Sequence, residues 1–272
     1  MRSIVIIPTY NERDNLPPLV EAVLAVAPDA DILVVDDNSP DGTGRLADAL
    51  AASTGRVRVL HRAGKQGLGS AYIAGFKDAL AHGYARIVEM DADFSHRPED
   101  LPALLRAAAQ ADVVVGSRNV PGGRAEHWSP LRHLISKGGS LYARTLLGLP
   151  IKDCTGGFKC FRREALQAID LDGVVSNGYG FQVEMNYLCH RAGLRLVEVP
   201  IIFPDRTAGH SKMSSRIMLE AATVVWRLRR RRLPAPAYVA VASDGRPAEP
   251  LTETVELIPS YADAGVMEGR HK

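Results

Sequence analysis

The sequence of 272 residues has few cysteines and no long apolar run, and each shortage excludes a class of protein. Its three cysteines, Cys154, Cys160 and Cys189, are too few and too widely spaced for a structural zinc site, and free thiols in a reducing compartment are the simplest interpretation. No stretch approaches the roughly 20 apolar residues that cross a bilayer, so we expect membrane contact to be peripheral. The N-terminus lacks a basic segment followed by an apolar one, so we expect no signal peptide and a cytoplasmic location.

Two glycine-rich nucleotide-binding motifs are also missing. No glycine fingerprint follows the first apolar strand, which excludes a nicotinamide-dependent oxidoreductase. Residues 64–69 (Gly-Lys-Gln-Gly-Leu-Gly) lack the Gly-Lys-Ser/Thr ending of a P-loop, and we interpret them as a flexible loop before a helix. The net charge is only +2, and the arginines within residues 227–232 precede a tail in which acidic residues dominate, so nothing indicates a nucleic-acid partner.

The sequence does have a clear alternation of strand and helix patterns. Short apolar strands are expected at residues 3–7, 32–35, 57–61, 87–90 and 113–116, and amphipathic helices at 16–27, 44–52, 68–82 and 101–109. This order predicts an α/β fold with an open, mostly parallel twisted sheet and helices on both faces. Farther along, the patterns predict helices at 131–147, 181–192 and 217–233, a strand at 195–199, and a largely disordered tail from residue 234 onward.

Two acidic loops follow expected strands. Asp36 and Asp37 come after the second strand, and Asp91-Ala92-Asp93 comes after the fourth. Open α/β sheets bind ligands outside the carboxyl ends of their strands. Two carboxylates separated by one small residue repel each other unless a cation lies between them, so this pair predicts a Mg²⁺ or Mn²⁺ site beside a diphosphate. A solvated loop remains the alternative.

Other polar side chains at the same edge have two interpretations each. Tyr10 could flank a base and Glu12 could accept from a base or ribose, or residues 8–12 could form only a strand-to-helix turn. Asp37 could bind the base or ribose, or stand as a surface carboxylate before an Asp-Gly turn. His96 could be a third metal ligand, but we favour a helix-entry residue before a proline.

Several cations follow the fifth strand. They would suit a donor diphosphate and an anionic acceptor if they converged, although each alone is more simply a solvated side chain. The sequence does not show convergence. The residues are Arg118, Arg132, Lys137, Arg206 and Lys212.

Taken in order, four motifs resemble those of family 2 glycosyltransferases, and more narrowly those of the polyprenol (dolichol) phosphate mannose synthases. They are residues 7–12 (Ile-Pro-Thr-Tyr-Asn-Glu), 35–41 (Val-Asp-Asp-Asn-Ser-Pro-Asp), 91–93 (Asp-Ala-Asp) and 116–118 (Gly-Ser-Arg). The resemblance covers roughly residues 1–233. It implies a GT-A-like catalytic domain at 1–213, an amphipathic basic helix at 214–233 and a tail at 234–272.

The resemblance also implies a reaction and its residues. The enzyme would transfer mannose from GDP-mannose to a polyprenyl monophosphate with inversion. Asp93 and Arg118 would be catalytic, and Asp91 and Asp93 would hold Mg²⁺ or Mn²⁺. Some members have glutamine where this chain has Ser95, so water would fill the third ligand position here. The donor would contact Pro8, Tyr10, Glu12, Val35, Asp37, Asp91, Ala92, Arg206 and Lys212, and the acceptor phosphate would contact Arg118, Arg132 and Ser136.

Alternatives remain open at this point. The donor could be UDP-glucose or another sugar nucleotide, and a catalytically silent, membrane-associated protein that binds nucleotide sugars is a different class. The segment 217–233 could lie in the membrane interface, with Trp226 at headgroup depth, or it could pack on the catalytic core. An integral membrane partner could also bring the protein to the bilayer.

Overall fold

The central element of the fold is a seven-stranded sheet. The computed structural model describes residues 1–205 and 215–231, without the side chains of residues 179 and 215–222. The strands follow the order β3-β2-β1-β4-β7-β5-β8, and every neighbouring pair is parallel except the two pairs that contain β7. The strands are β1 (Ser3–Thr9), β2 (Ala30–Asp36), β3 (Val57–His61), β4 (Arg86–Glu89), β5 (Val113–Ser117), β7 (Lys159–Arg162) and β8 (Leu196–Pro200).

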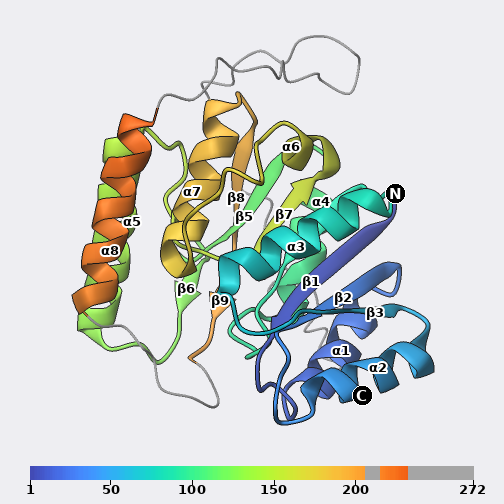
Figure 1. The fold of residues 1–272 in the computed structure, drawn as a ribbon. Helices are drawn as coiled ribbons and strands as arrows, with labels where there is room; N and C mark the ends of the chain where they lie inside the picture. Colours follow the sequence, from blue (N-terminus) through green and yellow to red (C-terminus); the bar gives the residue numbers. More distant parts are fainter. Residues whose placement is uncertain (206–214, 232–272) are drawn as a thin grey trace, which may run out of the picture.

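Helices cover both faces of this sheet (Figure 1). Side chains alternate along a strand, so Ile4 and Ile6 of β1 enter one apolar core while Val5 and Ile7 enter the other. The first core contains α3 (Leu68–Ala81), α6 (Arg163–Gln167) and α7 (Gly178–Arg191); the second contains α1 (Leu16–Val26), α2 (Thr43–Thr54) and α4 (Leu101–Ala107). The predicted α/β architecture is therefore confirmed.

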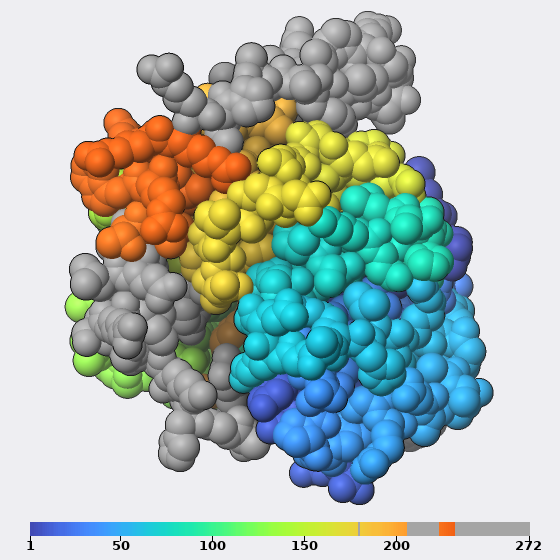
Figure 2. Space-filling model, viewed as in Figure 1, coloured from blue at the N-terminus to red at the C-terminus, as the bar shows by residue number. Residues whose placement is uncertain are grey.

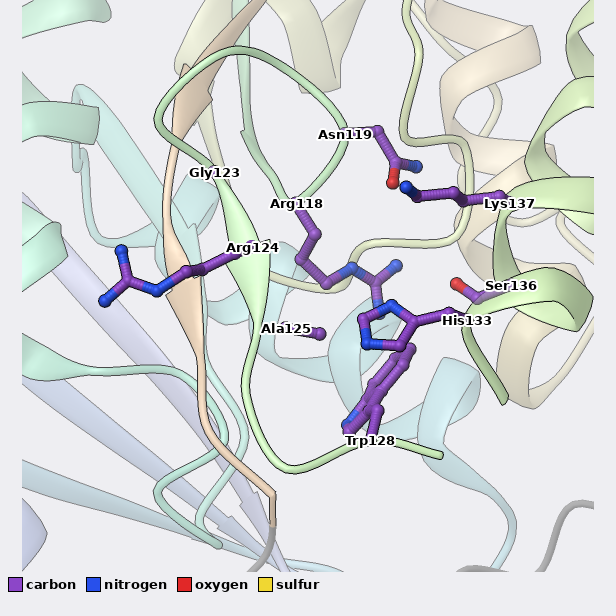
Figure 3. A pocket seen from close by; sticks show the side chains of 9 residues that line it. All are labelled: Arg118, Asn119, Gly123, Arg124, Ala125, Trp128, His133, Ser136 and Lys137. Carbon is purple, nitrogen blue, oxygen red and sulfur yellow. The ribbon is translucent and has the colours of Figure 1, made fainter. Parts of the chain in front are cut away.

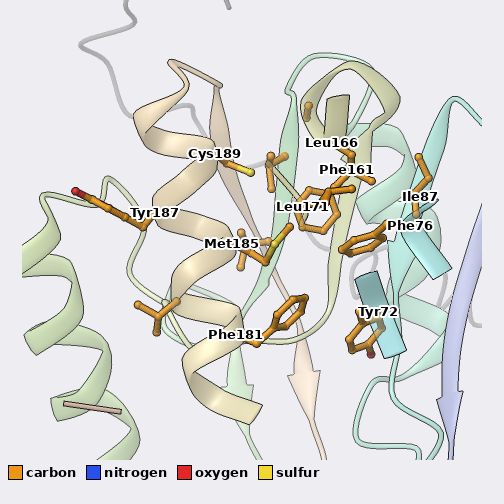
Figure 4. Packing of buried hydrophobic residues seen from close by; sticks show 14 of the residues in the cluster. Tyr72, Phe76, Ile87, Phe161, Leu166, Leu171, Phe181, Met185, Tyr187 and Cys189 are labelled. Atoms are coloured by element: carbon orange, nitrogen blue, oxygen red, sulfur yellow. The ribbon is translucent and has the colours of Figure 1, made fainter. Parts of the chain in front are cut away.

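The first core contains a group of packed aromatic side chains among its aliphatic residues. Phe181 and Met185 on α7 point toward Tyr72 and Phe161, whereas Tyr187 points to the opposite side of the helix (Figure 4). The Tyr72 and Phe181 rings stack with centroids 6.0 Å apart. The three cysteines are free, as the sequence predicts, and all three are buried.

Strand β7 is not among the predicted elements. It runs antiparallel between β4 and β5 and pairs Lys159 with both Glu89 and Val115. The short 3-10 helix η1 (Pro98–Asp100), helix α6 and a small second sheet of β6 (Arg124–Ala125) and β9 (Ile202–Phe203) were also not predicted. These elements are too short to show a periodic pattern.

Helix α5 (Pro130–Leu147) carries several of the residues predicted to bind phosphate. The Ser129 hydroxyl accepts from the backbone N–H of Arg132 at 3.3 Å, and Pro130 occupies the first turn, where its missing N–H costs nothing. The helix ends at Gly148, whose φ of 69° is the left-handed conformation that glycine adopts freely. Helix α5 thus begins at a fixed point, which sets the positions of Arg132 and Ser136.

Helix α8 (Ser215–Arg230) packs against α5 and α7. Val224, Val225 and Leu228 are buried in the first core, whereas Trp226 is exposed. Its outer side forms part of the molecular surface, the orange region in Figure 2. The described part of this helix therefore packs on the core, which was one of the two alternatives for segment 217–233. No helix in the described ranges 1–205 and 215–231 is long and apolar enough to cross a membrane.

Candidate active site

The carboxyl ends of β1 and β2 bring the first two predicted motifs together. Pro8 lies beside Val35 and Thr9 beside Asp36 in the parallel register. The Asp36 carboxylate accepts from the Thr9 hydroxyl at 2.9 Å and from the Ser39 hydroxyl at 2.6 Å. Asp36 therefore ties the two loops to each other, so it is structural.

Asp37 is buried beside a cation from the neighbouring strand. Its carboxylate lies 2.8 Å from Nη1 of Arg62 and accepts weakly from the backbone N–H of Gln66 at 3.4 Å. Burial raises the pKa of Asp37, against the opposing charge of Arg62. Lys65 Nζ lies 4.1 Å from the centroid of the Tyr10 ring. Lys65 and Gln66, which we interpreted as part of a flexible loop, therefore contact two predicted donor residues.

Glu12 lies four residues before α1 begins at Leu16. Its backbone N–H donates to the Thr43 hydroxyl at 3.0 Å, and its carboxylate accepts from Asn15 Nδ2 at 2.8 Å. Asn15 occupies the N-cap position of this helix. Glu12 is thus held at the same edge as Tyr10 and Asp37.

The Asp-Ala-Asp loop follows β4, and hydrogen bonds from Tyr72 and Ser95 hold its two carboxylates. Asp91 accepts from the Tyr72 hydroxyl at 2.9 Å, and the Asp93 carboxylate accepts from the Ser95 backbone N–H at 3.1 Å and from the Ser95 hydroxyl. Ala92 is buried. These hydrogen bonds fix both carboxylates at the sheet edge.

His96 lies at the helix entry just before η1, as the favoured interpretation predicted, and its side chain has a structural role. It is buried, and its Nδ1 accepts from the backbone N–H of Asp91 at 3.0 Å. Its ring stacks on Phe158 with centroids 5.0 Å apart. Burial lowers the pKa of His96, which favours the neutral ring that this acceptor role requires. Its side chain supports the backbone of Asp91 and is not presented as a ligand.

The two carboxylates of this loop fit a hard divalent cation. Asp91 and Asp93 offer oxygen atoms, which Mg²⁺ and Mn²⁺ prefer over nitrogen or sulfur. Across residues 1–205 and 215–231, no group of three His, Cys, Asp or Glu side chains could enclose a metal. An ion here would therefore take its remaining ligands from a donor diphosphate and water.

A second group of residues forms a basic pocket, shown in Figure 3. Arg118, His133, Ser136 and Lys137 direct their side chains toward the same space, whereas Arg124 points away and pairs with Glu126. The pocket is lined by Arg118, Asn119, Gly123, Arg124, Ala125, Trp128, His133, Ser136 and Lys137. Of the three residues predicted to bind the acceptor phosphate, Arg118 and Ser136 lie in this lining.

Trp128 links the third predicted acceptor residue to the pocket. The guanidinium carbon of Arg132 lies 4.1 Å from the centroid of a Trp128 ring, and that of Arg118 lies at 5.4 Å. Arg132 Nη1 also donates to Asp205 at 2.8 Å. Trp128 therefore makes cation–π contacts with both arginines. Trp128 lies within the part of the chain that resembles the family, but none of the four motifs contains it, so it was not predicted as a site residue.

The basic pocket and the acidic edge are joined by residues 155–158. The Thr155 hydroxyl accepts from Nη2 of Arg118 at 3.0 Å, while Phe158 stacks on His96, which supports Asp91. A Cβ on Gly157 would come within 3.4 Å of the His96 ring and 3.2 Å of Gln182, so glycine allows this segment to pass between them. Residues 155–158 therefore contact the basic pocket at one end and the acidic edge at the other. Arg206 and Lys212, predicted to close on the donor, lie outside the described residues.

Residues 4–170 match the family model described as glycosyl transferase family 2. This chain belongs to glycosyl transferase family 2. It is 53% identical over 227 residues to an undecaprenyl-phosphate mannosyltransferase of Micrococcus luteus, covering 84% of this chain and 93% of that protein. It is 51% identical over 234 residues to a polyprenol monophosphomannose synthase of Mycolicibacterium smegmatis, covering 85% and 88%. The resemblance seen in the sequence is confirmed.

Solved structures share the fold at much lower identity. A glucosyl-3-phosphoglycerate synthase of Mycobacterium tuberculosis, solved with Mn²⁺, UDP and phosphoglyceric acid, superposes with a TM-score of 0.61 at 16% identity, covering 84% of this chain and 78% of that one. A mannosyltransferase of Pyrobaculum calidifontis, solved with GDP-mannose and Mn²⁺, gives 0.57 at 17% identity, covering 86% and 65%. The GT-A-like fold is therefore confirmed.

Proposed function

We propose that this protein transfers mannose from GDP-mannose to a polyprenyl monophosphate and forms a β-linked polyprenyl phosphate mannose. The observation that carries the proposal is 53% identity, over 93% of its length, to a protein named undecaprenyl-phosphate mannosyltransferase. The site geometry supports it, because an edge that suits a nucleotide diphosphate adjoins a basic pocket that suits a second phosphate.

On the donor side, the chain supplies surfaces for a nucleotide and carboxylates for a metal. Tyr10, Glu12 and Asp37, with Pro8 and Val35 beneath them, would bind the base and ribose at the ends of β1 and β2. Asp91 and Asp93 would hold the divalent cation, with Ala92 close to the donor. A cation there would neutralise the charge that develops on the departing diphosphate. Arg206 and Lys212 would close on the same phosphates.

On the acceptor side, a phosphate oxygen attacks C1 of mannose. A new C1–O bond forms on one face while the bond from C1 to the GDP oxygen breaks on the other, so an α-linked donor gives a β-linked product. The phosphate is already anionic near neutral pH, so no strong general base is needed. Arg118, Arg132 and Ser136 would therefore orient the nucleophile, because catalysis here depends on placing reactants.

A panel of donors and acceptors tests this function directly. We expect organic-phase label from GDP-mannose with undecaprenyl phosphate, and much less from UDP-glucose or other sugar nucleotides. If only UDP-glucose gave organic-phase label, the protein would be a glucosyltransferase and the mannosyl assignment would be wrong. Binding of sugar nucleotides without any transfer would identify a catalytically silent protein.

The acceptor assignment predicts a selective kinetic effect. Arg132→Ala should raise the apparent KM for prenyl phosphate by about tenfold to a hundredfold and change the KM for GDP-mannose little, because one fork-shaped phosphate donor is lost. Steady-state kinetics with each substrate varied in turn measures this split. Arg124→Ala is the matched control, since Arg124 of β6 lies beside the pocket but turns its side chain away from it, toward Glu126 (Figure 3). Equal effects of both variants, or a change only in donor KM, would contradict the assignment.

Contact with a membrane surface is the second part of the proposal, because the acceptor is a lipid. Leu131, Leu134 and Leu141 are 65%, 70% and 62% exposed, and their spacing places them on one side of α5. Trp226 is 51% exposed on the neighbouring α8. This apolar stripe lies on the helix that also carries Ser136 and Lys137 of the basic pocket. It would let the phosphate enter the pocket while the prenyl chain stays in the bilayer.

Vesicle sedimentation tests this contact. The protein should bind anionic vesicles at low salt, and Leu131→Gln combined with Leu134→Gln should weaken binding severalfold, because apolar area is lost from the interface. Binding should also weaken with salt, since each basic residue near an anionic surface adds about 1 kcal/mol. Val175→Gln is the control, because Val175 is equally exposed but lies outside both helices. Absence of binding at low salt would favour a separate integral membrane partner.

A further inference from the structure

Arg118 is held by a carboxylate that no predicted role includes. Arg118 Nε donates to Asp153 Oδ2 and Nη2 donates to Asp153 Oδ1, both at 2.7 Å. The Arg118 backbone N–H donates to the same Oδ2 at 3.0 Å, and Nη2 also donates to the Thr155 hydroxyl at 3.0 Å. This is a two-pronged pair with an added backbone contact, so it fixes both the position and the rotation of the guanidinium.

Asp153 is in turn fixed by the sheet. The backbone N–H groups of Lys152 and Asp153 each donate to a carboxylate oxygen of Glu198 at 2.8 Å. Glu198 lies in β8, directly beside Val115 of β5. The position of the Asp153 carboxylate is therefore set by β8, and the Arg118 guanidinium is set by that carboxylate.

The side chains of this pair are 8% exposed for Arg118 and fully buried for Asp153, and the arginine reaches the pocket. Asp153 is fully buried, and its pKa is held low by the Arg118 charge and hydrogen bonds, although burial alone would raise that pKa. Arg118 lines the pocket that contains Ser136 and Lys137. A buried ion pair adds little net stability compared with an apolar pair, so fold stability alone gives a weak reason for this arrangement.

We infer that Asp153 is a positioning residue for the acceptor phosphate, which it serves by holding the Arg118 guanidinium at the pocket wall in one orientation. This rests on the proposed function, in which Arg118 binds the phosphate of a prenyl acceptor. Without the carboxylate, Arg118 would keep its charge but lose its fixed direction. Thr155 takes a smaller part in the same task through its single hydrogen bond.

Asp153→Asn tests the inference because it keeps the size of the side chain and removes its charge. The amide presents an N–H group to the arginine in place of one acceptor oxygen. We expect the acceptor kcat/KM to fall by about tenfold to a hundredfold, since small displacements of a binding group cost this much, while the KM for GDP-mannose stays nearly constant. Asp112→Asn is the matched control. Asp112 is also buried and accepts from the Arg195 backbone N–H at 2.8 Å, but it precedes β5 at the end opposite Arg118.

A binding measurement separates this inference from the proposed reaction. The chain has two tryptophans, so Trp226→Phe leaves Trp128, which contacts the pocket arginines, as its single fluorescent reporter. Titration with geranyl phosphate should give a saturable change in this background, and adding Asp153→Asn should raise the Kd about tenfold or more. An unchanged Kd would overturn the positioning role and leave the acceptor assignment intact. No response before Asp153 is changed would overturn the acceptor site, and this inference with it.

Thr155→Val provides a milder variant if Asp153→Asn fails to fold, as judged by circular dichroism and a thermal melt. It removes one hydrogen bond to the same guanidinium and leaves the ion pair in place. We expect a smaller shift of the geranyl phosphate Kd in the same direction. A Thr155→Val protein that binds like its parent would then contradict the inference.

Discussion

Replacing Asp93 with asparagine should reduce turnover by about 10²- to 10³-fold while the fold stays intact. A metal that stabilises a departing diphosphate is worth several kcal/mol in the transition state, and each 1.4 kcal/mol is about a factor of ten in rate. Asparagine keeps an oxygen that can accept from the Ser95 N–H, which Asp93 now does at 3.1 Å, so the loop should keep its shape. Transfer of labelled mannose and titration of Mn²⁺ by electron paramagnetic resonance measure the two consequences separately.

The control for this substitution is Asp48→Asn, because Asp48 is an exposed carboxylate on α2 that pairs with His61. It should leave both turnover and Mn²⁺ affinity unchanged. Wild-type protein in excess chelator should lose activity and regain it with Mg²⁺ or Mn²⁺. Undiminished transfer by the Asp93→Asn protein, or by the wild type in chelator, would contradict the metal assignment.

The strands that flank the acidic loops could be predicted because the residue pattern that defines each strand lies within the strand itself. Strand β3 has the predicted limits, Val57–His61, and β5 is one residue longer than expected, because each is a short β-branched run between turn residues. Parallel strands also end at a common sheet edge, so the motifs at Tyr10, Asp37 and Asp91 could be assigned to one edge from the sequence alone. Their proximity is observed, and their roles toward donor and metal remain predictions.

Side chains that support the site could not be predicted, because their partners are distant in sequence. Asp36 and Asp37 are neighbours with the same charge, yet one binds Thr9 and Ser39 and the other pairs with Arg62. Nothing in the motif distinguishes them. The pair of Arg118 and Asp153 spans 35 positions, and it forms only because a loop returns to the end of β5.

Strand β7 was not predicted for a different reason. Its sequence, Lys-Cys-Phe-Arg, has a charge at each end and is only four residues long, so it resembles a loop. Lys159 is nevertheless fully buried, next to Glu89 in the antiparallel register. A buried lysine is rare unless its charge is compensated, and only the folded chain shows how: Lys159 Nζ donates to the Gln182 carbonyl at 3.3 Å and to Gln182 Oε1, and its charge acts on the buried Glu89. Replacing Lys159 is therefore a test of the topology.

Replacing Lys159 with methionine should destabilise the protein by about 3–5 kcal/mol at pH 8, because it leaves the Glu89 carboxylate buried without its cation. Burial already raises the pKa of Glu89 from 4.5 to about 7, and the Lys159 charge opposes that rise. The contribution of such a raised carboxyl group is present at low pH and is lost as pH rises through its folded pKa. The cost of Lys159→Met should therefore be smaller at pH 6, where Glu89 is largely protonated, than at pH 8.

Urea unfolding of three variants at both pH values checks this expectation. Glu89→Gln combined with Lys159→Met should recover most of the stability lost at pH 8, because it removes the unpaired charge. Lys77→Met is the control, since Lys77 pairs with Asp172 at the surface and such pairs are worth at most about 1 kcal/mol. If Lys159→Met costs no more than Lys77→Met at pH 8, or if its cost does not grow with pH, then Lys159 does not stabilise the Glu89 charge within this sheet.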